Sequence, residues 1–184
     1  MIAMRFFTPR LFIDLNSEDE DVVGRAEEKW EAARREYQEY FKSIDKKLPA
    51  SLARFSKMVA LHDGQIQERI GTAEEFDNQG EHSRAIVAVK HERAEYSLVY
   101  LNLTEPTRLT HPVDSPVFRH DNVIWLYDEV GCVKKGVFSH EILFSNGNVL
   151  LVKFRSFRYT ERPIVTARLH AVRESTSRGR LATG

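Results

Sequence analysis

Hydrophobic residues follow two different spacings, and the change falls near residue 60. Before that point they recur every three or four positions, which is typical of helices with one buried face. After it, hydrophobic and polar residues alternate, which is typical of strands with one buried face. The pattern predicts an α+β fold, in which an N-terminal helical hairpin packs on an antiparallel β-sheet of about five to seven strands.

The helical part is predicted to open with a short helix over residues 9–15, because a Thr-Pro pair suits the N-cap and the first helical position. Ser17 and Glu20 are spaced as a capping box, in which the Ser17 hydroxyl accepts from the amide of Glu20 and the Glu20 carboxylate accepts from the amide of Ser17. A long helix over residues 18–46 should follow. Its apolar stripe is expected to form core: Val22, Val23, Ala26, Trp30, Ala33, Tyr37, Tyr40, Phe41 and Ile44.

A second, shorter helix is expected after the break at Leu48-Pro49. It carries Leu52 and Phe55 on one face and should pack back on the long helix as a helical hairpin. The predicted organisation is a helical segment over 1–59, a β-sheet region over 60–172 in the same compact domain, and a mobile tail over 173–184.

Seven stretches of the second part are candidate strands: 61–70, 84–91, 95–103, 117–130, 136–145, 148–157 and 164–172. Asn146-Gly147 lies between two apolar runs and predicts a hairpin with a type I′ turn, in which both central residues take positive φ. A second hairpin is predicted to turn at residues 92–94. Consecutive strands joined by short polar turns favour an antiparallel sheet.

Charge and cysteine content narrow the classes of function. Lys+Arg and Asp+Glu both number 27, whereas proteins that bind nucleic acid or anionic membranes usually carry a basic excess. Cys132 is the single cysteine, which excludes an intrachain disulfide and favours a reducing compartment. Since no apolar run could span a membrane and the N-terminus lacks a signal-peptide pattern, we expect a cytoplasmic protein.

The pair His62-Asp63 is the first candidate for chemistry. It matches the middle element of the HD phosphohydrolase pattern, but no histidine precedes it and Gly64 interrupts any helix. A metal-assisted hydrolase could instead combine His62 and Asp63 with His140 and nearby carboxylates, since imidazole and carboxylate suit zinc, iron or manganese. The simpler interpretation is a turn from helix to strand, shaped by Asp63 and Gly64, with no metal bound.

The stretch KFRSFRY, residues 153–159, is the second candidate. On one strand it would place Lys153, Arg155, Phe157 and Tyr159 on a single face. Basic and aromatic side chains on a strand can hold single-stranded nucleic acid, because cations neutralise phosphates and rings stack on bases. The alternative is an exposed or edge strand whose charges discourage aggregation.

Two stretches together resemble a family of bacterial proteins of unknown function. MRFFTPRLF (residues 4–12) is similar to their opening, and VALHDGQI (residues 59–66) is similar to a Leu-His-Asp turn that follows their helical part. The run FSHEILFSNGNVLLVKF further along is similar as well. The resemblance implies that the His-Asp pair is a family feature, and it implies no activity, since none is assigned to the family.

No nucleotide-phosphate loop, nucleophile elbow or metal motif is present in the sequence. We therefore expect a non-catalytic domain that needs no cofactor and binds a protein partner or a small ligand. Nucleic acid and a second copy of the chain are kept as alternative partners, and a membrane is not expected. The candidate binding residues are His62, Asp63, His140, Lys153, Arg155, Phe157 and Tyr159.

Overall fold

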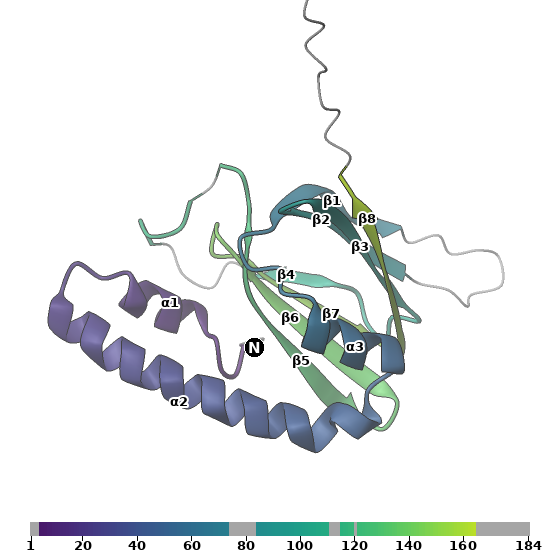
Figure 1. Cartoon of the computed structure of the whole chain (residues 1–184), viewed down its shortest axis with the longest axis horizontal. Coiled ribbons are helices and arrows are strands. Elements are labelled where there is room, and N and C mark those ends of the chain that lie inside the picture. Colours follow the sequence, from purple (N-terminus) through teal and green to yellow (C-terminus); the bar gives the residue numbers. More distant parts are fainter. Residues whose placement is uncertain (1–3, 74–83, 111–114, 120, 165–184) are drawn as a thin grey trace, which may run out of the picture.

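The computed structural model describes residues 4–73, 84–110, 115–119 and 121–164 (Figure 1). Three α-helices precede the strands: α1 (Pro9–Leu15), α2 (Glu20–Ile44) and α3 (Ala50–Met58), with a 3₁₀ turn, Asp45–Lys47, after α2. The strands are β1 (Gln65–Ala73), β2 (Arg84–His91), β3 (Ala94–Leu101), β4 (Arg108–Thr110), β5 (Trp125–Lys134), β6 (Val137–Phe144), β7 (Val149–Phe154) and β8 (Ser156–Pro163). The α+β class with an antiparallel β region is confirmed. The predicted tail and nearly all of the candidate strand 164–172 lie outside the described residues.

The described strands form two antiparallel sheets of four. Sheet A has the order β1-β2-β3-β8, and sheet B has the order β4-β7-β6-β5. The short strand β4 lies between the candidate strands 95–103 and 117–130, where the sequence pattern predicted no strand. No helix among the described residues combines the length and the apolar character needed to cross a membrane.

The predicted strand 148–157 is in fact two strands that belong to different sheets. The chain leaves sheet B after Phe154, bends at Arg155 and enters sheet A at Ser156. At this corner the amide of Arg155 donates to the carbonyl of Leu101 on β3 (3.2 Å). Hydrophobicity alone gives no sign of the bend, because apolar residues continue on both sides of it.

The start of α2 differs from the predicted capping box. The N-cap is Asp19, whose carboxylate accepts from the amides of Asp21 (2.9 Å) and Val22 (3.2 Å). The Ser17 hydroxyl accepts from the amide of Asp19 instead (3.2 Å). A carboxylate at the N-cap also interacts favourably with the positive end of the helix dipole, which favours Asp19 over Ser17.

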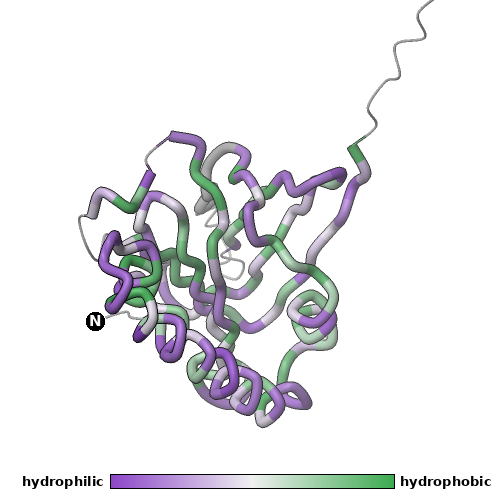
Figure 2. Tube along the Cα trace, turned by 60° about the vertical axis from the view of Figure 1, so that its left-hand side comes forward, coloured by the Kyte–Doolittle hydropathy of each residue, from purple (hydrophilic) through white to green (hydrophobic). Residues whose placement is uncertain are grey.

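The helical hairpin is formed by α1 and α2 rather than by α2 and α3 (Figure 1). The predicted N-cap of α1 is confirmed, since the Thr8 hydroxyl accepts from the amide of Leu11 (3.2 Å). Helix α3 packs on β8 instead, where the Ser51 hydroxyl donates to the carbonyl of Phe157. The apolar stripe of α2 faces the protein as expected, and hydrophobic segments alternate with hydrophilic ones along this helix (Figure 2).

Hydrophobic side chains form two clusters, one on each face of sheet B. The inner cluster fills the space between the two sheets and α3; its largest members include Phe55, Tyr100, Trp125, Phe154 and Phe157. The outer cluster lies between sheet B and the N-terminal region, and its buried members are Met4, Phe6, Phe7, Phe118, Leu126, Leu143 and Val149. Sheet B is thus covered on both faces.

The predicted hairpin turn at Asn146-Gly147 exists with a different geometry. Gly147 has φ of 80°, while Asn146 is not at positive φ, so the turn is not type I′. The amide of Gly147 donates to the carbonyl of Phe144 (2.9 Å), which closes a three-residue loop with glycine in the left-handed position. The predicted turn at residues 92–94 is confirmed between β2 and β3.

Candidate functional site

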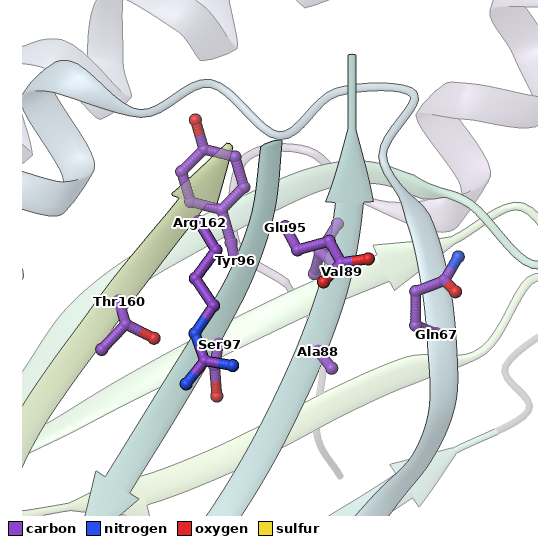
Figure 3. A pocket seen from close by; sticks show the side chains of 8 residues that line it. All are labelled: Gln67, Ala88, Val89, Glu95, Tyr96, Ser97, Thr160 and Arg162. Carbon is purple, nitrogen blue, oxygen red and sulfur yellow. The ribbon is translucent and has the colours of Figure 1, made fainter. Parts of the chain in front are cut away.

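A cavity lies on the outer face of sheet A (Figure 3). Its floor is a row of register partners that crosses all four strands: Gln67, Ala88, Ser97 and Thr160. Cross-strand partners point to the same face of a sheet, so three small side chains lie side by side there. Larger neighbours surround them, and the row forms the bottom of a hollow of about 270 Å³, the sheet A cavity.

Two opposite charges line this cavity. Glu95 on β3 and Arg162 on β8 are register partners one row away from Ser97 and Thr160. Figure 3 shows the Arg162 guanidinium extending toward Ser97, while the Glu95 carboxylate extends toward β2. Neither side chain forms an ion pair with another residue in the described part of the chain. Both charges therefore remain available to a ligand.

His62 and Asp63 form the turn between α3 and β1, as the simpler interpretation predicts. Asp63 takes the left-handed conformation with φ of 65°. Its amide donates to the carbonyl of Trp125 (2.9 Å), and the amide of Trp125 donates to the carbonyl of Gly64 (2.8 Å). These two bonds attach the turn to the start of β5.

The His62 ring has its own contacts and remains half-exposed. Its Nδ1–H donates to the carbonyl of Leu126 (2.6 Å), and the ring stacks on Tyr127 at a centroid distance of 5.3 Å. Nε2 lies 3.6 Å from the Asp63 carboxylate. Within the described residues, no three His, Cys, Asp or Glu side chains gather into a group that could hold a metal ion.

His140 is fully buried against rings of the inner cluster. It does not line the sheet A cavity, and its hydrogen bonds within the described residues do not involve His62 or Asp63. Its Nδ1 is 2.8 Å from the Tyr100 hydroxyl and its Nε2 is 3.0 Å from the Asp128 carboxylate. Burial, and secondarily the charge of Asp128, raises the pKa of Tyr100 well above its usual value, so the phenol stays protonated and donates to Nδ1. The Nε2–H then donates to Asp128, whose other oxygen accepts from the Trp125 indole (3.0 Å). Every polar group in this series of hydrogen bonds has a partner, which is typical of a structural polar network in a core.

The four candidate residues of the stretch 153–159 do not share a face. Lys153 is on β7 and pairs with Glu105 (2.7 Å), while Arg155 is at the corner. Phe157 is 2% exposed and lies in the inner cluster, with Tyr159 packed against it. The single platform for stacked bases that a continuous strand would give is therefore not formed by these residues.

Glu129 binds the N-terminal segment to sheet B. Its buried carboxylate accepts from three consecutive amides, those of Arg5 (2.9 Å), Phe6 (2.7 Å) and Phe7 (2.6 Å). Burial raises the pKa of this carboxyl, and the three amides oppose that shift. The contact holds Phe6 and Phe7 in place as members of the outer cluster.

Glu141 is the register partner of Glu129 on β6. Burial, with a smaller contribution from the charge of Glu129, raises its pKa to about 7, and Lys153 opposes the shift. The buried Oε2 atom has no hydrogen-bond partner among the described residues. Two neighbouring carboxyls thus differ in role: Glu129 is held by amides, and Glu141 is the one suited to keep a proton near neutral pH.

Sequence analysis missed the residues of the sheet A cavity. Alternation along 95–103 places Glu95 and Ser97 on one face, but nothing in the sequence states that β8 is the neighbour of β3. Arg162 and Thr160 therefore had no visible connection to this face. Only the strand order brings these four residues together.

Comparisons with known proteins add no family assignment. No protein-family model, no curated protein and no solved structure matches the chain. The resemblance to bacterial proteins of unknown function stays a prediction.

Proposed function

We propose that this protein is a non-catalytic binding domain, and that the sheet A cavity binds a small polar ligand. The observation that carries the proposal is a hollow lined by Glu95 and Arg162, which form no ion pair within the described part of the chain, beside neutral hydrogen-bonding groups. Concave sites with a few convergent polar groups are the usual form of small-molecule sites. A volume of about 270 Å³ suits a small molecule.

The contrast between the two sheets supports this choice. The outer face of sheet B is covered by α1, α2 and the N-terminal segment. On the outer face of sheet A, side chains such as Ile86, Ala88 and Val99 remain partly exposed. An exposed face that combines apolar and polar groups is where a ligand gains most from burial.

The two alternative functions gain no supporting contact. His62 and His140 have separate hydrogen-bond partners, on the surface turn and in the core. Lys153 and Phe157 belong to different sheets. A cytoplasmic location is part of the proposal, and the single cysteine, Cys132, supports it.

The test is a binding screen observed by NMR on the ¹⁵N-labelled full chain. Small polar molecules (free amino acids, carboxylates, sugar phosphates and nucleosides) are added one at a time. A ligand of the cavity should shift the amide signals of Ser97 and Thr160 in preference to those of α2. Ser97→Tyr fills the hollow and should abolish the shifts, since tyrosine suits a strand and should keep the fold.

The control is Arg93→Tyr, which adds the same side chain at the exposed β2–β3 turn outside the cavity. This variant should bind like the parent. Binding that survives Ser97→Tyr, or the absence of any binder in the screen, would contradict the proposed function.

A further inference from the structure

The arrangement of charge in the sheet A cavity points to the class of ligand, and this inference rests on the proposed function. We infer that the cavity selects a small zwitterion, a molecule that carries an ammonium and a carboxylate a few bonds apart, such as a free α-amino acid. Arg162 would hold the carboxylate and Glu95 the ammonium.

The first support is the opposite sign of the two lining charges. Opposite charges on directly paired strand positions commonly interact with each other. Here Glu95 and Arg162 form no ion pair with any described residue, and their charged groups extend in different directions along the face (Figure 3). A ligand with both charges can satisfy the two groups at once, while an anion or a cation satisfies one of them.

The second support is the chemistry between the charges. Ser97, Thr160 and Gln67 contribute neutral hydroxyl and amide groups, which can both donate and accept hydrogen bonds. Such groups complement the polar backbone of an amino acid without favouring either of its charges. A guanidinium suits a carboxylate especially well, because its planar donors can bind both oxygens.

Two further cations on this face lie outside the cavity lining. Lys90 is the register partner of Glu95 on β2, and Arg158 lies one row beyond Thr160 on β8. Both are exposed and neither lines the hollow. They provide matched control positions, since they have the same charge on the same face without contact with a ligand in the cavity.

The experiment measures affinity by isothermal titration calorimetry with the full chain. The twenty common amino acids are the first probes, and the N-acetyl and carboxamide analogues of each binder are the second. We expect at least one free amino acid to bind, and each analogue to bind about tenfold more weakly or worse, since each loses one charge-assisted contact.

The variants assign each charge to its partner. Arg162→Gln should remove the preference for the free acid over the carboxamide, and Glu95→Gln should remove the preference for the free amine over the N-acetyl compound. Lys90→Gln and Arg158→Gln should leave the affinity within about twofold of the parent. All four side chains are exposed, so circular dichroism should report an unchanged fold.

The outcomes separate the two proposals. If N-acetyl amino acids or simple carboxylates bind as tightly as free amino acids, the zwitterion inference is wrong and the binding function remains. If amino acids bind but neither Glu95→Gln nor Arg162→Gln changes the affinity, the inference is also wrong. If no amino acid binds while another class of polar molecule shifts the amide signals of Ser97 and Thr160, only the zwitterion inference fails. If no molecule binds, both the inference and the proposed function fail.

Discussion

At Gly64 the backbone passes so close to its neighbours that a side chain has no room. A Cβ atom there would lie 2.6 Å from a methyl carbon of Val89 and 2.8 Å from the carbonyl oxygen of Leu61. The residue at positive φ in this turn is Asp63, so glycine is needed at 64 for space rather than for its φ angle. The sequence pattern located the turn correctly, and the close packing that requires glycine there is visible only in the folded structure.

Gly64→Ala should therefore destabilise the protein by about 1–3 kcal/mol, through the clash with Val89 and Leu61. Gly24→Ala is the matched control, because a Cβ at this helical position would meet no described atom within 4 Å apart from its chain neighbours and the helix's own backbone. The free energy of unfolding of that variant should increase by roughly 0.5–1 kcal/mol, because alanine has a higher helix propensity than glycine. Urea unfolding of the two variants and the parent measures both effects, and equal changes at the two positions would contradict the account.

Glu141 predicts a pH dependence of stability. Its pKa rises from 4.5 to about 7 on folding, so the folded protein binds this proton more tightly than the unfolded chain does. The resulting stabilisation is fully present below pH 4.5 and is lost as the pH rises through about 7. Above that pH the side chain is ionised in both states and the contribution is flat.

Glu141→Gln removes this titration. Relative to the parent, the variant's free energy of unfolding should increase by about 1–2 kcal/mol as the pH rises through this window, with allowance for the partial exposure of the side chain. Denaturant unfolding at half-unit pH steps measures the difference. Glu129 is present in both proteins, so the difference reports the titration of Glu141 together with its coupling to Glu129. Parallel curves would show that the pKa of Glu141 is not raised.

At the scale of elements, α2 protects the free edge of sheet B. The Tyr37 hydroxyl accepts from the amide of Val130 (2.8 Å), and the Tyr40 hydroxyl accepts from the amide of Cys132 (3.1 Å). Both amides belong to β5, which is the edge strand. Exposed edge amides are sites for unwanted pairing with other chains, and the two hydroxyls occupy them.

Tyr37→Phe should lower the free energy of unfolding by about 1–3 kcal/mol, because it leaves the amide of Val130 without an acceptor in a site that water hardly reaches. Hydrogen exchange of that amide should become faster. Tyr127→Phe is the control, since the Tyr127 hydroxyl has no hydrogen bond with another described residue and its loss should be nearly neutral. Similar losses of stability in both variants would rule out a specific role for the edge contact.

The spacing of apolar residues was sufficient to predict the helices and most strands. The helix over 9–15 and the strand over 84–91 are found with the same bounds. The errors fall where a tertiary contact decides the structure. At the corner the amide of Arg155 bonds to β3, and at Gly147 the ring of Phe118 would lie 2.7 Å from a Cβ atom, so a side chain has no room there.

At the scale of the whole molecule, one carboxylate connects the N-terminal segment to the sheets. Glu129→Gln should loosen the N-terminal segment around residues 5–7, because an amide oxygen is a weaker acceptor for three backbone donors than a carboxylate. Trypsin cleavage after Arg5 or Arg10 should accelerate about tenfold, while exchange protection in sheet A stays unchanged. Glu39→Gln, on the exposed face of α2, serves as the control and should cleave at the parent rate.

The candidate site could be predicted only in part, because it depends on the strand order of the whole molecule. Its charges come from strands that are adjacent in space and separated in the chain by four other strands. The conspicuous residues, His62 and His140, have their hydrogen bonds satisfied by the turn and by the core. Hydrophobic alternation predicts the face of the strand on which a residue lies. The residue opposite it on the neighbouring strand can be identified only when the complete strand order is known.

The corner at Arg155 also has a consequence for the order of folding. While the chain is being synthesised, β3 emerges long before β8, and β4 to β7 must follow before its second neighbour exists. Until then β3 is an open edge that carries Leu98 and Tyr100 on its apolar side. Pairings of this long range form late and slowly, and an open edge invites association with other chains. The nascent protein should depend most on chaperones in the interval that ends when β8 becomes available.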